Sequence, residues 1–194
     1  MRWLAVAVVA GLATGALTLA GQAVLPTEAN RLANSGAIWV SVAFAVGWRA
    51  PSDAMAALAG LMALVAALVG YFVTAAIAQA GVSASTVAIW VAVALIGGPV
   101  FGIAGRWRAT APGWRAAIAV AALGAVYLSE GLWTLWGIPH MALAGWASVV
   151  VGCLITLLLA SDRDTRTRAC LLLVPLTALG LAGYGAIDLV FRSV

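Results

Sequence analysis

The chain has 194 residues, of which 65% are apolar and only 8% are charged, with a formal net charge of +4. Soluble domains carry about 25% charged residues, so ten basic and six acidic side chains are too few to cover a soluble surface. With a mean hydropathy of +1.12, this composition excludes a soluble enzyme, a nucleic-acid-binding protein and a disordered chain. The sequence therefore predicts an all-α integral membrane protein whose first partner is the lipid bilayer.

The first apolar run covers residues 3–25 and follows the charged start Met1-Arg2. A secretory signal starts similarly, but its apolar core has about 7–15 residues, whereas about 20 are needed to cross a bilayer. We therefore expect a retained transmembrane helix. Gly11 and Gly15 on this helix would let the backbone of a neighbouring helix approach closely.

Six further apolar runs follow, and prolines mark four of the connections, at Pro26, Pro51, Pro112 and Pro139. The run 36–48 is shorter than an ordinary crossing of about 20 residues, so it either crosses with little tilt or is partly re-entrant. Seven spans in a single transmembrane domain (1–194) is the prediction, and six spans is the alternative. The expected spans are residues 3–25, 36–48, 54–79, 85–105, 115–136, 141–160 and 170–191.

All ten basic residues are arginines, and cytoplasmic loops carry an excess of Lys and Arg. With the N-terminus inside, only Arg31 and Arg192 fall outside. The inner side then holds Arg2, Arg49, Arg106, Arg108, Arg115, Arg163, Arg166 and Arg168. This distribution predicts a cytoplasmic N-terminus and an external C-terminus, with residues 161–168 as a solvated inner turn. Since Arg-, Ala- and Gly-rich usage is typical of GC-rich bacterial genomes, we expect a bacterial inner (plasma) membrane.

An internal repeat relates residues 37–43 (AIWVSVA) to residues 88–94 (AIWVAVA). Each copy is followed by Gly-Trp-Arg-Ala, at residues 47–50 and 113–116, and a weaker third copy begins at Gly145. The pattern predicts one N-terminal helix followed by three helical hairpins of the same orientation. Parallel repeats occur in transporters, and duplicated hairpins also occur in inert scaffolds.

Each proposed hairpin has a tyrosine in the outer half of its second helix, followed one turn later by a polar residue. Residues three or four apart share a helix face, so converging faces would form an outward-opening pocket. The tyrosines are Tyr71, Tyr127 and Tyr184, and the polar residues are Thr74, Glu130 and Asp188. The candidate ligand-binding residues are Tyr71, Tyr127, Glu130, Trp133, Tyr184 and Asp188, with Asn34 and Ser35 at the rim.

Glu130 is the sharpest single candidate, because an acid within a span is retained mainly for function; the cost is roughly 2.5–3.5 kcal/mol at the centre and smaller near the outer end, where Glu130 lies. In the pocket it would act as a counter-ion or proton acceptor. The alternative interpretation is a solvated interfacial acid paired with Arg31.

Metal and catalytic motifs are missing from the sequence. The acids and the single histidine, His140, lack the helical spacing of a metal site, and Cys153 and Cys170 are expected to be apolar packing residues. No Gly-x-Ser-x-Gly, Walker or His-Glu-x-x-His motif occurs. We therefore expect no metal, no cofactor and no enzymatic activity.

Gly97, Gly98 and Pro99 are expected to bend the helix that contains them, because proline removes one backbone hydrogen bond. Gly98 and Gly102 also form a second close-packing pair. A bend of this kind would permit movement of the helix.

Three segments carry a resemblance to a known family: residues 34–39 with 43–47, residues 97–102, and the acid Glu130. They resemble a family of small bacterial multi-pass membrane proteins that is known only as a domain of unknown function. That resemblance implies a multi-pass fold and supplies no activity. More loosely, the size and the Gly-Pro-x-x-Gly element are similar to substrate-binding components of energy-coupling-factor vitamin transporters, which have six spans and both termini inside.

Two functional hypotheses remain open at this point. The first is a membrane protein that binds or transports a small solute through the outward-facing polar and aromatic pocket. The alternative is a non-transporting scaffold or accessory subunit that binds another membrane protein or a second copy of itself.

Overall fold

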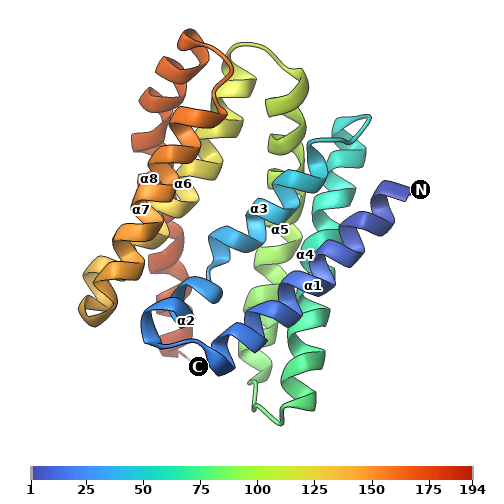
Figure 1. Ribbon diagram of the computed structural model, residues 1–194, viewed down its shortest axis with the longest axis vertical. Coiled ribbons are helices and arrows are strands. Elements are labelled where there is room, and N and C mark those ends of the chain that lie inside the picture. Colours follow the sequence, from blue (N-terminus) through green and yellow to red (C-terminus); the bar gives the residue numbers. More distant parts are fainter. Residues whose placement is uncertain (1, 194) are drawn as a thin grey trace.

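The computed structural model describes the backbone of residues 2–193 and the side chains of residues 3–191, and it is helical throughout, as the sequence predicts (Figure 1). The side chains of Arg2 and Arg192, which enter the predicted orientation, lie outside the described residues. The helices are α1 (Arg2–Val24), α2 (Thr27–Ala33), α3 (Gly36–Gly47), α4 (Asp53–Ile77), α5 (Ala84–Thr110), α6 (Trp114–Gly137), the 3-10 turn η1 (Pro139–Met141), α7 (Ala142–Leu159) and α8 (Arg163–Ser193).

Six helical segments in the described part of the chain are long and apolar enough to cross a membrane: α1, α4, α5, α6, η1 with α7, and α8. The run predicted at 36–48 forms α3, which has 12 residues and a length of about 18 Å against an apolar core of about 30 Å. The number of full-length spans is therefore six, the alternative that the short run left open.

The short helix α3 packs against α1, α4, α5 and α6 and carries the chain back toward the end at which α1 begins (Figure 1). The helix α2 and the non-helical residues Asn34 and Ser35 precede it. The second passage through the bundle is thus a broken helix. Of the two residues at the break, Ser35 is 2% exposed, whereas Asn34 is exposed.

Two helices are longer than predicted from their apolar runs, because a helix can continue beyond the last apolar residue. Helix α5 extends to Thr110, and α8 begins at Arg163 within the segment expected to be a turn. Asp162 accepts hydrogen bonds from the backbone N–H and the hydroxyl of Thr165. These bonds, the backbone one foremost, lower the pKa of the Asp162 carboxyl to about 2 and fix the start of α8.

Glycines set the closest helix contacts, as the two glycine pairs predict. Cβ atoms at Gly11 and Gly15 of α1 would collide with backbone atoms of α4. Cβ atoms at Gly98 and Gly102 of α5 would likewise collide with α4, where Gly60 faces them. Helix α5 remains helical through Pro99, and the bend expected at residues 97–99 stays a prediction.

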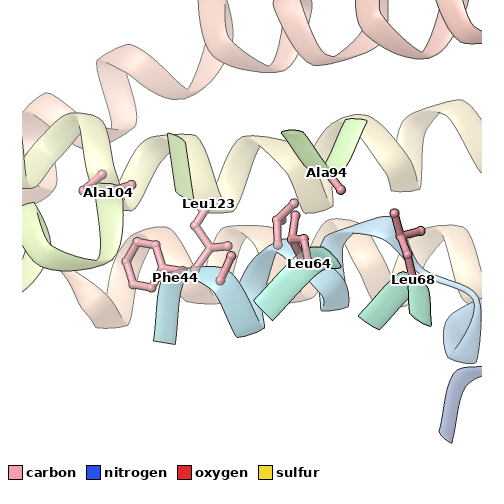
Figure 2. Close-up of a cluster of buried hydrophobic side chains, with 9 residues drawn as sticks. Phe44, Leu64, Leu68, Ala94, Ala104 and Leu123 are labelled. Carbon is pink, nitrogen blue, oxygen red and sulfur yellow. The ribbon is translucent and has the colours of Figure 1, made fainter. Parts of the chain in front are cut away.

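The main core cluster centres on α3. Figure 2 shows Phe44 of α3 with Leu64 and Leu68 of α4, Ala94 and Ala104 of α5, and Leu123 of α6. The short helix α3 therefore shares one core with α4, α5 and α6. On the other side α6 packs against both α7 and α8, which contact each other little, so the third proposed hairpin is held together through α6.

Candidate functional site

Glu130 lies two helical turns before the end of α6 and is only 2% exposed. Its Oε2 accepts the backbone N–H of Ala37 at 3.0 Å and the hydroxyl of Tyr184 at 2.9 Å. Its Oε1 lies 3.8 Å from Nη1 of Arg31, and the ring of Tyr184 stacks on Trp133 with 6.1 Å between the ring centroids. We call Arg31, Glu130, Trp133 and Tyr184 the Glu130 cluster.

The Glu130 cluster ties the break in the second passage to α6 and α8. Ala37 belongs to the first turn of α3, where unpaired N–H groups make the helix end electropositive. Ser35 satisfies a second N–H of this turn, that of Ile38. Glu130 is therefore buried, unlike the solvated acid considered above, but it does lie beside Arg31 as that alternative expected.

Arg31 is shared between the cluster and the break. Its Nη2 donates to the hydroxyl of Thr134 at 3.1 Å, and its Nη1 donates to the backbone oxygen of Asn34 at 3.4 Å. The arginine side chain is 20% exposed and the glutamate side chain 3%. A buried charge pair of this kind is costly to break by removing one partner.

The other predicted site residues occupy separate places. Tyr127 shares a hydrogen bond with Ser41 at 3.0 Å, and Tyr71 donates to Gln22 at 3.1 Å. Asp188 is half-buried on α8, four residues beyond Tyr184. Tyr127 and Tyr184 thus both lie toward the Ala37–Ser41 side of α3, through Ser41 and Glu130, whereas Tyr71 lies elsewhere, against Trp39.

A cavity of about 300 Å³ lies between α3, α4 and α5, and we call it the α3–α5 cavity. Four aromatic rings line it, from Trp39, Tyr71, Phe72 and Trp90. Its polar lining comes from the broken passage and from the start of α5: Asn34, Ser35, Ser83 and Thr86. Three residues of the predicted set, Asn34, Ser35 and Tyr71, are therefore in its wall.

Gly36 separates the cavity from the Glu130 cluster. It lines the cavity, and a Cβ at this position would lie 3.7 Å from Oε2 of Glu130 and 3.8 Å from the hydroxyl oxygen of Tyr184. The cluster and the cavity are thus on opposite sides of the first turn of α3. A shift of that turn would therefore change both the shape of the cavity and the hydrogen bond from Ala37 to Glu130.

Sequence reasoning did not place Trp39 and Trp90 at a site, although the repeat contained the signal. These are the two tryptophans of the matched segments 37–43 and 88–94, and both line the α3–α5 cavity. Trp39 also donates its indole N–H to Thr18 and packs edge-on against Tyr71. Glu28 was missed as well: its carboxylate accepts the N–H of Ala144 and caps α7 from α2.

A model for DUF6518, described as a family of unknown function, matches residues 1–190. The chain belongs to this family. Membership in DUF6518 confirms the resemblance to a family of unknown function over nearly the whole chain, and it assigns no activity. Comparison with curated proteins finds no match, and neither does comparison with solved structures.

Proposed function

We propose that this protein is a non-enzymatic membrane protein that binds a small, uncharged, flat solute in the α3–α5 cavity and carries it across the membrane. The observation that carries the proposal is the cavity itself, with four aromatic rings and a polar lining at a broken helix. Ligand sites are typically mostly apolar, of about 300–1,000 Å³, with a few placed polar groups.

The lining defines the chemistry of the solute. None of the described residues that line the cavity is charged, so a charged solute would lose its hydration without gaining a counter-ion. The rings of Trp39 and Trp90 favour a planar partner. Ser35, Ser83 and Thr86 offer hydroxyls for one or two hydrogen bonds.

The broken helix supports movement in addition to binding. Discontinuous helices in transporters place backbone groups and helix ends beside the substrate near the middle of the membrane. Here the break at Asn34 and Ser35 borders the cavity. Glu130, which accepts the N–H of Ala37 in the first turn of α3, lies seven residues before the end of α6, or about 10 Å along the helix axis. The start of α3 is therefore at a similar depth. A tilt of α3 about this break would open or close the cavity.

The arginine distribution supports an external mouth. Arg106, Arg108 and Arg115 lie at the end of the bundle opposite the loop that contains Gly81 and Ser83 (Figure 1). With these arginines inside, the N-terminus is cytoplasmic, the C-terminus is external and the cavity faces outward from a bacterial inner membrane. Energy-coupling-factor substrate-binding components also have six spans, but both of their termini are inside. The proposed external C-terminus of this chain therefore differs from them.

The proposal is tested with a matched pair of probes, 2-naphthol and naphthalene-2-sulfonate, which share a ring system and differ in charge. On the purified full chain in neutral detergent, we expect 2-naphthol to raise the midpoint of thermal unfolding and the sulfonate to leave it unchanged. At a probe concentration of 100 times Kd, the stabilisation would be about 2.7 kcal/mol.

Two variants locate the binding of 2-naphthol. Ala94→Phe fills the cavity, since Ala94 lines it and is 3% exposed, and we expect it to abolish the shift. Ala92→Phe makes the same change on the exposed side of α5 and should retain it. Trp90→Ala, which removes a ring without adding bulk, should weaken binding about tenfold or more. Equal shifts in the Ala94 and Ala92 variants would refute binding in this cavity.

The accessory-subunit alternative is favoured by one feature, the outer face of α8. Only 6% of its most apolar stretch is buried, and a Cβ atom at the exposed Gly183 would meet nothing within 4 Å. Small residues of this kind let a second helix approach closely. A membrane-protein partner or a second copy would cover this face, and Gly183→Leu would then dissociate the complex without changing 2-naphthol binding.

A further inference from the structure

A second concave site lies at the arginine-rich end of the bundle, remote from the α3–α5 cavity. It is a shallow groove of about 700 Å³ between the start of α4 and the α5–α6 connection. We call it the inner groove. Its lining residues are Ser52, Asp53, Arg106, Trp107, Thr110, Ala111, Pro112, Trp114 and Arg115.

The charge balance in the inner groove favours an anion. The only described acid that lines it is Asp53, and both of its oxygens already have donors. Oδ1 pairs with Nε of Arg106 at 3.0 Å, and Oδ2 accepts the indole N–H of Trp107 at 3.1 Å. Arg106 also donates Nη1 to the backbone oxygen of Ala50. The Asp53 charge is therefore neutralised by its neighbours, and the charge of Arg115 is left over.

Arg115 is held in a pose that presents its donors. Its guanidinium lies over the ring of Trp107, 5.5 Å from the centroid. A guanidinium placed over an aromatic ring still has N–H groups able to donate to a phosphate, which they fit in pairs. Among the described residues Arg115 has no ion-pair partner, and its side chain is exposed.

The depth of the inner groove matches the lipid headgroups. Trp107 lies in the last turn of α5, and Trp114 begins α6. Tryptophans at helix ends mark the boundary between the apolar core and the headgroup layer. The guanidinium of Arg168 lies over Trp114, 5.0 Å from the centroid, so one wall of the groove is held in place from α8.

We propose that the inner groove binds the phosphate of an anionic phospholipid headgroup, with Arg115 as the main phosphate ligand and Trp107 and Trp114 beside the upper acyl chains. The hydroxyl of Ser52 accepts from the N–H of Met55, so its own proton is free for a second hydrogen bond to the phosphate. The site is independent of the proposed solute cavity.

The test compares two arginines at the same end of the bundle. Dioctanoyl phosphatidylglycerol is titrated onto the purified full chain in neutral detergent, and bound lipid is counted by native mass spectrometry. We expect Arg115→Gln to weaken binding about thirtyfold, the loss of a hydrogen bond to a charged group. Arg166→Gln removes the same charge from an exposed position outside the groove and should cost at most about fivefold.

Two further arms complete the experiment. Thr110→Phe fills the groove without changing charge and should also weaken phosphatidylglycerol binding, with thermal unfolding confirming that the variant is folded. Inorganic phosphate should not compete, because it lacks the acyl chains, and dioctanoyl phosphatidylcholine, whose net charge is zero, should compete only weakly. Equal losses in the two arginine variants would overturn the site in favour of diffuse attraction, and competition by inorganic phosphate at the lipid's own potency would overturn the lipid as its ligand.

Discussion

Replacing Glu130 with alanine is expected to lower the free energy of unfolding by about 3–5 kcal/mol, the usual cost of removing one partner from a buried charge pair. The change leaves the guanidinium of Arg31, the N–H of Ala37 and the hydroxyl of Tyr184 without their shared acceptor. Glu130→Gln keeps an acceptor oxygen and should cost less, since only the charge is lost.

Unfolding of the full chain in detergent, followed by circular dichroism, measures this effect. Asp164→Ala is the control. It removes an exposed carboxylate that pairs with Arg168 within α8, and exposed pairs contribute less than about 1 kcal/mol. If Glu130→Ala were as stable as Asp164→Ala while 2-naphthol no longer bound, Glu130 would be a ligand-binding group and not an anchor for α3.

The second large effect is expected for Gly102→Ala, which should lower the free energy of unfolding by about 3 kcal/mol. A Cβ at Gly102 would collide with the carbonyl oxygen of Ala56 in α4 and lie 3.2 Å from the Cα of Gly60. Backbone atoms cannot turn aside as side chains do, so α4 and α5 must separate. Because both helices line the α3–α5 cavity, the variant should also lose 2-naphthol binding.

Gly183→Ala provides the matched control for the glycine prediction. It makes the same change within α8, where a Cβ meets nothing within 4 Å. Alanine is the better helix former by about 0.5–1 kcal/mol, so this variant should be as stable as the natural chain or slightly more so. A Gly102→Ala protein with unchanged stability would mean that α4 and α5 do not pack as closely as described.

The sequence was sufficient to predict the all-helical class, the places of the six long helices and the close approach at Gly11, Gly15, Gly98 and Gly102. These features follow from hydropathy and residue size along a single helix. The shortness of the apolar run 36–48 already indicated that this segment is not an ordinary full-length span. The two added helical turns at the start of α8, from Arg163, were missed because hydropathy marks the apolar region and not the end of hydrogen bonding.

The arrangement of the site was harder to predict, because it depends on how helices rotate against one another. One-turn spacing correctly places Tyr127 and Glu130 on one face of α6, but it does not determine what that face meets. Glu130 meets the broken end of α3, and Tyr71 meets a cavity on the other side. The repeat was the better guide to the cavity, since its two tryptophans, Trp39 and Trp90, both line it.

The α3–α5 cavity and the Glu130 cluster share the first turn of α3, which gives the two sites different roles. Gly36 lines the cavity, and a Cβ at this position would be in van der Waals contact with Glu130. In the proposed mechanism the solute contacts the rings and hydroxyls of the cavity, while Glu130 fixes the position of the wall. Solute binding and the strength of the Glu130 contacts would then be coupled.

Photoaffinity labelling with a diazirine derivative of 2-naphthol tests the central proposal most directly, because it reports which residues the bound probe touches. On the full chain in neutral detergent, with excess 2-naphthol as competitor, we expect competed labels on α3, α4 and α5 at Trp39, Tyr71 or Trp90. Competed labels at Trp133 and Tyr184 of the Glu130 cluster, with none on α3–α5, would contradict it.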